Sequence, residues 1–150
     1  MDVKIAFQGQ LDVKASAQRV YKILVDPKLI GSALPDVEQL RQISEDEFEA
    51  KVKVGVAFIK GSLDVRGKIV DKKEPEAATL VTEGKGLGST VKIQAAFSLS
   101  EQGEMTRMKW NAEADISGLL TGPGERLIRA QADKVIQTIL TKIKEEAEKA

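Results

Sequence analysis

The sequence predicts an α+β fold in which a curled antiparallel sheet of seven strands grips one long C-terminal helix. Apolar and polar residues alternate in one opening segment and in six consecutive segments between about residues 37 and 116, as in half-buried strands. Apolar residues then recur at helical spacing to the end of the chain. A twisted antiparallel sheet with a single amphipathic helix buries its apolar face by curling around that helix. We expect one domain over residues 1–150.

The first strand is predicted over 3–13. Its apolar face is formed by Ile5, Phe7, Gly9, Leu11 and Val13. Because Gly9 lacks a side chain inside a strand, it indicates a bulge or a close backbone contact.

Two short helices should follow this strand. Ser16 can cap the first helix, and Asp26-Pro27 ends it and begins the second with proline in the first turn. Leu34-Pro35 ends the second helix. The apolar side of the first helix carries Val20, Ile23 and Leu24.

The central series of strands is predicted over 37–44, 47–56, 62–72, 78–83, 89–100 and 104–116. In the last strand, Trp110, Ala112 and Ala114 form one face, while charged Lys109 and Glu113 belong to the other. Such alternation is typical of an antiparallel sheet with one solvated face. Short breaks rich in Gly, Glu, Asp and Pro predict hairpin connections.

The last segment, about 122–148, is predicted as the long helix. At about 1.5 Å per residue it would be roughly 40 Å long, enough to cross the sheet. Its apolar stripe consists of Leu127, Ile128, Ala132, Val135, Ile136, Ile139, Leu140 and Ile143.

The turns of such a sheet fall alternately at its two ends, and the two sets differ in character. Those near 44–47, 72–76 and 101–104 are charged, and we expect them to be solvated. Those at 57–61, 84–88 and 117–124 combine apolar side chains with seven glycines. Apolar tips at one end predict a partner, a membrane surface or the mouth of a ligand cavity with mobile lips. The alternative is that they fold inward and plug the sheet. The candidate mouth residues are Phe58, Ile59, Leu87, Leu119 and Leu120.

The inward faces are almost wholly aliphatic, which predicts an apolar cavity that selects a lipophilic guest by shape and burial. A solid core is the alternative. The predicted cavity wall consists of Val54, Val56, Val91, Ile93, Met108, Trp110, Leu127 and Ile128.

Composition excludes several classes of function. The 23 Lys and Arg cancel the 23 Asp and Glu, unlike a basic nucleic-acid binder. Without cysteine or histidine, the chain has no thiolate nucleophile, no Cys-based metal site and no imidazole acid or base. Gly118, Gly122 and Gly124 lack phosphate-loop spacing. We expect neither catalytic residues, metal nor cofactor.

The location is predicted from what the sequence lacks. Its apolar runs are far shorter than the roughly 20 residues of a membrane-spanning helix. The start, Met1-Asp2-Val3-Lys4, lacks the apolar stretch of a signal peptide. We expect a cytoplasmic protein.

An ordered set of short motifs extends over nearly the whole chain. It consists of Phe7-Gln8-Gly9, Asp26-Pro27, Leu34-Pro35, Val52-Lys53-Val54-Gly55, Gly84-Lys85-Gly86, Thr106, Ser117-Gly118-Leu119-Leu120 and Gly122-Pro123-Gly124. Together these motifs resemble the carbon monoxide dehydrogenase CoxG family of the START-like, or SRPBCC (polyketide cyclase/dehydrase and lipid transport), superfamily. The resemblance implies a helix-grip, Bet v 1-like fold with an apolar cavity. It also implies a role beside a molybdenum-containing carbon monoxide dehydrogenase, in membrane recruitment and quinone handling.

The chain departs from this family at two points. Tyr21 stands where the first helix often has tryptophan. The chain also stops at Ala150, without the long tail that anchors many members, so we expect at most peripheral membrane contact.

Three functions remain open. The first is a non-catalytic carrier of a lipophilic molecule such as a quinone or lipid, accessory to a molybdenum hydroxylase. In the second, the apolar tips dock on a partner enzyme or membrane and the cavity is incidental. The third, a cyclase-type enzyme, needs polar groups on an inward face, where only Thr106 is convincingly placed.

Overall fold

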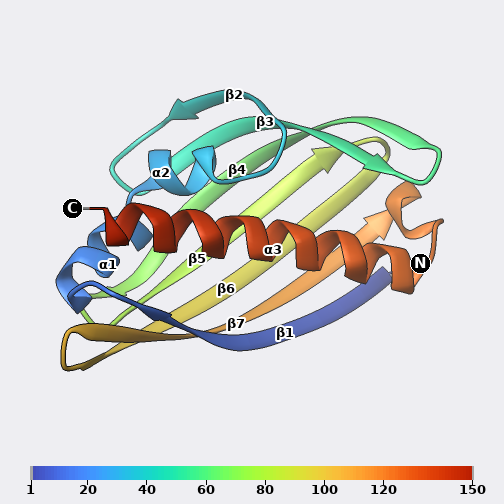
Figure 1. Cartoon of the computed structure of the whole chain (residues 1–150). Helices are drawn as coiled ribbons and strands as arrows, with labels where there is room; N and C mark the ends of the chain where they lie inside the picture. Colours follow the sequence, from blue (N-terminus) through green and yellow to red (C-terminus); the bar gives the residue numbers. More distant parts are fainter. Residues whose placement is uncertain (1, 150) are drawn as a thin grey trace.

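The computed structural model describes residues 2–149 and has the predicted architecture (Figure 1). One antiparallel sheet has the strand order β1-β7-β6-β5-β4-β3-β2, and α3 lies across its concave face. The elements are β1 (Asp2–Val13), α1 (Ala17–Leu24), α2 (Pro27–Ser32), β2 (Val37–Gln42), β3 (Glu47–Val56), β4 (Ile59–Lys73), β5 (Ala77–Gly86), β6 (Ser89–Gln102), β7 (Met105–Gly118), the 3₁₀ turn η1 (Leu119–Thr121) and α3 (Glu125–Glu148). The predicted fold class is therefore confirmed.

The two short helices begin at the predicted caps. The Ser16 hydroxyl accepts a hydrogen bond from the backbone N–H of Arg19 at 3.2 Å. The Asp26 carboxylate accepts from the N–H groups of Lys28 and Leu29 at 3.1 and 3.3 Å. Both caps satisfy N–H groups that a helix start leaves without partners.

Several strand ends differ from the prediction, because the hairpins at the apolar end have two-residue turns. Ala57, with φ of 56°, begins the β3–β4 turn, so β4 starts at Ile59 rather than at 62. Leu87 and Gly88 adopt φ of 55° and 63° between β5 and β6. Gly86 consequently belongs to β5, which was predicted to end at 83.

The long helix also begins later than predicted, at Glu125 rather than 122. The chain first forms η1 and then passes through Gly124, whose φ of 99° is incompatible with the helix. None of the described helices is both long and apolar enough to cross a membrane.

The buried apolar side chains form two separate clusters. The first core cluster lies beside α1, α2 and the C-terminal half of α3, and the second lies around η1 and the start of α3. The first consists of Val13, Val20, Tyr21, Leu24, Ile30, Phe48, Ala50, Ile69, Ala78, Leu80, Phe97, Met108, Leu140, Ile143 and Ala147. The second consists of Val3, Ile5, Leu63, Ala114, Ile116, Leu120 and Ile128.

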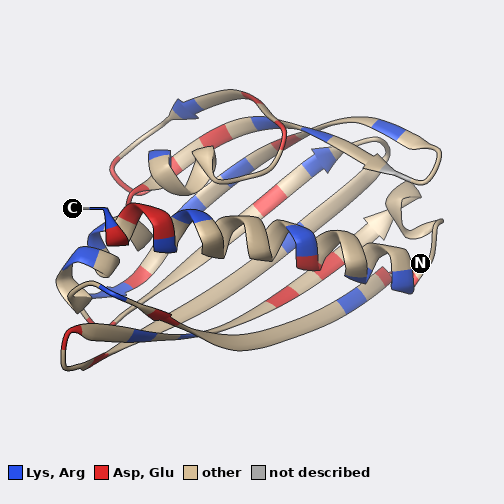
Figure 2. Ribbon diagram, in the orientation of Figure 1, with Lys and Arg blue, Asp and Glu red and all other residues tan. Residues whose placement is uncertain are grey.

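The charged turns lie together at the α1 end of the sheet, as predicted (Figure 2). They are not merely solvated, because their acidic side chains hold α1. The Glu101 carboxylate accepts from the N–H of Ala17 at 2.9 Å, and Gln18 donates to Glu74 at 2.6 Å.

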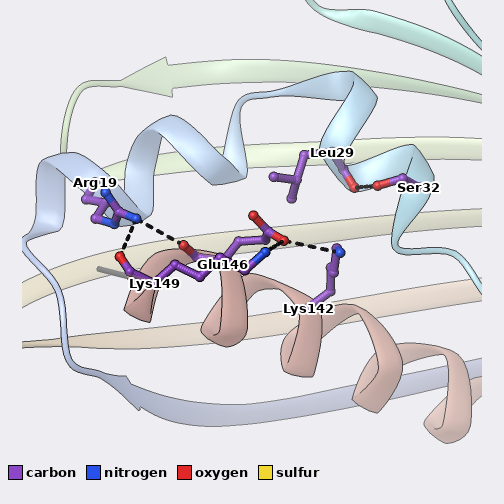
Figure 3. Close-up of polar contacts among 6 residues, drawn as sticks. All are labelled: Arg19, Leu29, Ser32, Lys142, Glu146 and Lys149. Carbon is purple, nitrogen blue, oxygen red and sulfur yellow. Dashed lines mark hydrogen bonds and ion pairs between the residues drawn. The ribbon is translucent and has the colours of Figure 1, made fainter.

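The C-terminal end of α3 is fixed to α1 by one arginine (Figure 3). The Arg19 guanidinium donates to the backbone carbonyls of Ala147 at 2.6 Å, Lys149 at 2.7 Å and Glu146 at 3.3 Å. The Glu146 carboxylate pairs with Lys142 at 3.2 Å and Lys149 at 2.8 Å. A cation at carbonyls that a helix leaves unpaired also favours the helix dipole. Arg19 therefore helps to determine where α3 crosses the sheet.

Candidate ligand-binding interior

The five predicted mouth residues lie at the same end of the sheet but in different environments. Phe58 is 87% exposed and Leu119 is 65% exposed. Ile59 and Leu87 are half-buried against the second core cluster. Leu120, expected at an exposed tip, is instead buried in that cluster. Part of the apolar end therefore folds inward, and part remains exposed.

The glycines at this end allow the three connections to pack closely. A Cβ on Gly61 would clash with the Leu87 side chain. The Leu87 side chain therefore packs directly against the backbone of Gly61. A Cβ on Gly88 would lie 3.2 Å from Leu119 Cδ1, and one on Gly118 would clash with the Gly88 carbonyl. These glycines therefore allow close packing, whereas the sequence had suggested that they make the loops around the mouth mobile.

Buried hydrogen bonds reinforce this packing. The Ser89 hydroxyl accepts from the N–H of Leu120 at 2.9 Å and donates to the Leu87 carbonyl at 3.2 Å. Ser89 is 8% exposed. It therefore joins η1 to the β5–β6 turn and holds Leu120 inside.

The predicted wall residues whose side chains the structure describes fall into three groups. Met108 and Ile128 are buried in the first and second core clusters, respectively, while Leu127 is 48% exposed and belongs to neither cluster. The side chain of Val56 lies outside the described part of the structure. The half-buried wall residues are Val54, Val91, Ile93 and Trp110.

A band of half-buried apolar side chains lies between the two core clusters. We call it the interior band, and it consists of Phe7, Val52, Val54, Val65, Val91, Ile93, Ala95, Trp110 and Ile136. On the strands these residues alternate with exposed outward residues such as Lys53, Asp64 and Lys92. Val65 contacts both clusters. The residues of the band are therefore less completely buried than those of the clusters on either side.

Most inward polar groups serve the fold. Thr106 is fully buried, and its hydroxyl donates to the Ala15 carbonyl at 2.7 Å, fixing the segment that leads into α1. Thr82 lies 3.5 Å from the Ile93 carbonyl. Within residues 2–149, His, Cys, Asp and Glu side chains form no group of three that could hold a metal ion. The interior can therefore select by shape and burial, with few hydrogen bonds.

Two contacts on the β1 side of the interior were not fully foreseen. Gly9 pairs regularly with Trp110, and a Cβ on Gly9 would lie 2.8 Å from indole Cζ2. This confirms the close-contact alternative at Gly9. The guanidinium of Arg129, on α3, lies 5.7 Å from the centre of the Phe7 ring. The contact between Arg129 and Phe7 could not be predicted from the sequence, because it depends on how α3 is rotated over β1.

Comparison with known proteins gives both a family and a set of fold relatives. Residues 9–148 match the family of the carbon monoxide dehydrogenase CoxG subunit. A conserved protein from Geobacillus kaustophilus has a TM-score of 0.84 and 24% identity, over 95% of each chain. No curated protein matches this sequence.

More distant structures share the fold. A START superfamily protein from Mycobacterium smegmatis has a TM-score of 0.65 at 15% identity, over 95% of this chain and 97% of that chain. Ara h 8.0201 has a TM-score of 0.67 at 13% identity, over 97% and 98%. The helix-grip fold is therefore shared with START and Bet v 1-like proteins.

Proposed function

The chain belongs to the carbon monoxide dehydrogenase CoxG family, and from this premise we propose that it is a non-catalytic carrier of a lipophilic small molecule. The guest, a quinone or a lipid, would lie between the sheet and α3. The carrier would serve a molybdenum-containing carbon monoxide dehydrogenase.

The observation that supports this proposal most directly is the interior band. Apolar side chains that remain accessible to water inside a fold gain free energy when a guest covers them, about 25 cal/mol for each Å² removed from water. Because the inward Thr106 and Ser89 hydroxyls are already hydrogen-bonded, most of the binding energy would come from burial.

We propose that the guest enters at the hairpin end. Phe58 and Leu119 would form the exposed rim of this entrance, with Ile59, Leu87 and Leu120 behind them. Opening would require Leu87 to move off Gly61. Binding should therefore be slower than diffusion alone allows.

Trp110 provides a direct test, since it is the one tryptophan of the chain and belongs to the interior band. A short-tailed quinone should quench its fluorescence saturably. Ala95→Phe places a ring inside the band and should abolish saturable quenching. The matched control is Ala96→Phe on the same strand, because Ala96 belongs to the opposite face of β6. Equal quenching in both variants would contradict an interior site.

Exposed apolar residues also favour a second candidate, an adaptor that docks on the dehydrogenase. Phe58 and Leu119 are the most exposed of the large hydrophobic residues described, and exposed apolar surface of this kind marks interaction sites. Replacing both with Asp should prevent copurification of the dehydrogenase if they dock. Ile43→Asp, at an exposed apolar residue in the charged turns, is the control.

Native mass spectrometry of gently purified protein separates the two candidates. A carrier retains a small molecule of defined mass, which Ala95→Phe should eliminate. An adaptor retains a large polypeptide of the dehydrogenase, which the tip variant should eliminate.

A further inference from the structure

Where α3 meets β1, two side chains in or beside the interior band have N–H donors that no described residue accepts. Arg129 lies there, with its guanidinium 5.7 Å from the centre of the Phe7 ring. Its acidic neighbour Glu125 is 4.0 Å away, at the limit of an ion pair, and both side chains are at least half exposed. Among the described residues, no group accepts a hydrogen bond from this guanidinium. Arg129 therefore has hydrogen-bond donors available at the edge of an apolar interior.

Trp110 supplies a second donor on the same side. Its indole lies against Gly9, where a Cβ would be 3.2 Å from the indole nitrogen, Nε1. Phe7 and Gly9 lie next to one another on the inward face of β1, opposite Ala112 and Trp110. Trp110 is half-buried, and its N–H donates to no group in the described part of the chain. The opposite side of the band, on β3 and β4, consists of Val52, Val54 and Val65.

From this asymmetry, and resting on the carrier function proposed above, we propose that the guest is an amphiphile with a carboxylate head. Arg129 binds the head at the junction of α3 and β1, and the apolar chain extends toward Val54 and Val65. A guanidinium over an aromatic ring keeps its planar set of donors free to bind a carboxylate at two points. The Trp110 N–H is a second donor on the same side of the interior.

The test compares dodecanoate with its methyl ester, which has the same chain but no charge. Binding to the native protein is measured by titration calorimetry. We expect the carboxylate to bind at least about tenfold more tightly than the ester, as befits a charge-assisted hydrogen bond. Arg129→Gln should remove this preference while leaving the affinity for the ester unchanged. Arg129→Lys should keep part of it, because the charge remains but the two-point geometry is lost.

Arg126→Gln is the matched control, since Arg126 is an exposed arginine in the same part of α3. It should alter neither affinity. Equal binding of acid and ester to the native protein, or the same loss of both in Arg129→Gln, would overturn the carboxylate proposal while leaving the carrier function intact. If dodecanoate, its ester and a short-tailed quinone all fail to bind, the carrier function itself is refuted.

Discussion

Phe48 packs between two glycines. This packing can be tested by adding a methyl group at one glycine and replacing the ring with a smaller side chain. Phe48 is fully buried in the first core cluster. A Cβ on Gly67 of β4 would clash with ring atoms Cε1 and Cζ, while one on Gly31 of α2 would lie 3.1 Å from Cδ2. The ring therefore fills the space between α2 and the sheet.

The expected magnitudes follow from these contacts. Gly67→Ala should lower the free energy of unfolding by about 1–3 kcal/mol, the usual cost of overpacking a core. Phe48→Leu should lower it by about 1–2 kcal/mol through lost burial. The smaller Leu side chain leaves room for the new methyl group. The double variant should therefore lose about 1 kcal/mol less than the sum of the two single-variant losses.

Urea unfolding of the four proteins, with slopes compared to check that each unfolds similarly, measures this coupling. Gly55→Ala is the control, since a Cβ there meets no atom within 4 Å. If the stability losses of Gly67→Ala and Phe48→Leu are additive in the double variant, the packing of this ring on Gly67 is refuted. A loss in Gly67→Ala no greater than that in Gly55→Ala would refute it as well.

Three further changes test the contacts that position the fold. Arg19→Ala should lower the free energy of unfolding by about 1–2 kcal/mol and speed amide exchange in the last turn of α3, since that turn loses its capping donor. Thr106→Val should cost about 1–3 kcal/mol in urea unfolding, because the Ala15 carbonyl loses its partner. Hydrogen bonds from Arg66 and Arg41 hold the pKa of Glu49 below its ordinary value of 4.5. The stability contributed by this carboxylate is thus present above that value and lost as pH falls through the lowered pKa. Glu49→Gln should flatten the loss of thermal stability between about pH 5 and pH 3.

The strands were predictable because period-two alternation records which side chains face the core. It does not record where a strand stops. Ile59 and Gly86 were assigned to the turns at 57–61 and 84–88, yet Ile59 begins β4 and Gly86 ends β5. The decisive feature was the positive φ of Ala57 and Leu87, which turns the chain within two residues. Neither residue favours that conformation, so no local pattern showed that these two predicted turns would be only two residues long.

The candidate site was predictable only as a set of faces. Alternation correctly brought Val54, Ile93 and Trp110 to the concave side. It could not show that Leu120 folds back under its own turn, because that depends on the hydrogen bond that the Leu120 N–H donates to Ser89, 31 residues earlier in the chain. Arg129 was missed for a similar reason. Only the rotation of α3 against β1 distinguishes it from the other charged residues of the helix.

The separation of the core into two clusters has a geometric cause. A helix of 24 residues is about 36 Å long and nearly straight, while the sheet beneath it is curled (Figure 1). A straight rod across a concave surface makes its closest contacts toward its ends. Accordingly, Ile128 and Ile143 are buried, whereas Ile136 between them is only half-buried.

Only large side chains in the middle of the sheet could fill the space under such a rod. At several of these positions the chain has small or β-branched residues instead, including Val54, Val65 and Ala95. Any well-packed core would favour larger residues there, since unfilled apolar space costs stability. Ala95→Leu should therefore raise the thermal midpoint while weakening guest binding. A lowered midpoint would mean that the band is already packed, and the argument for an interior guest would fail with it.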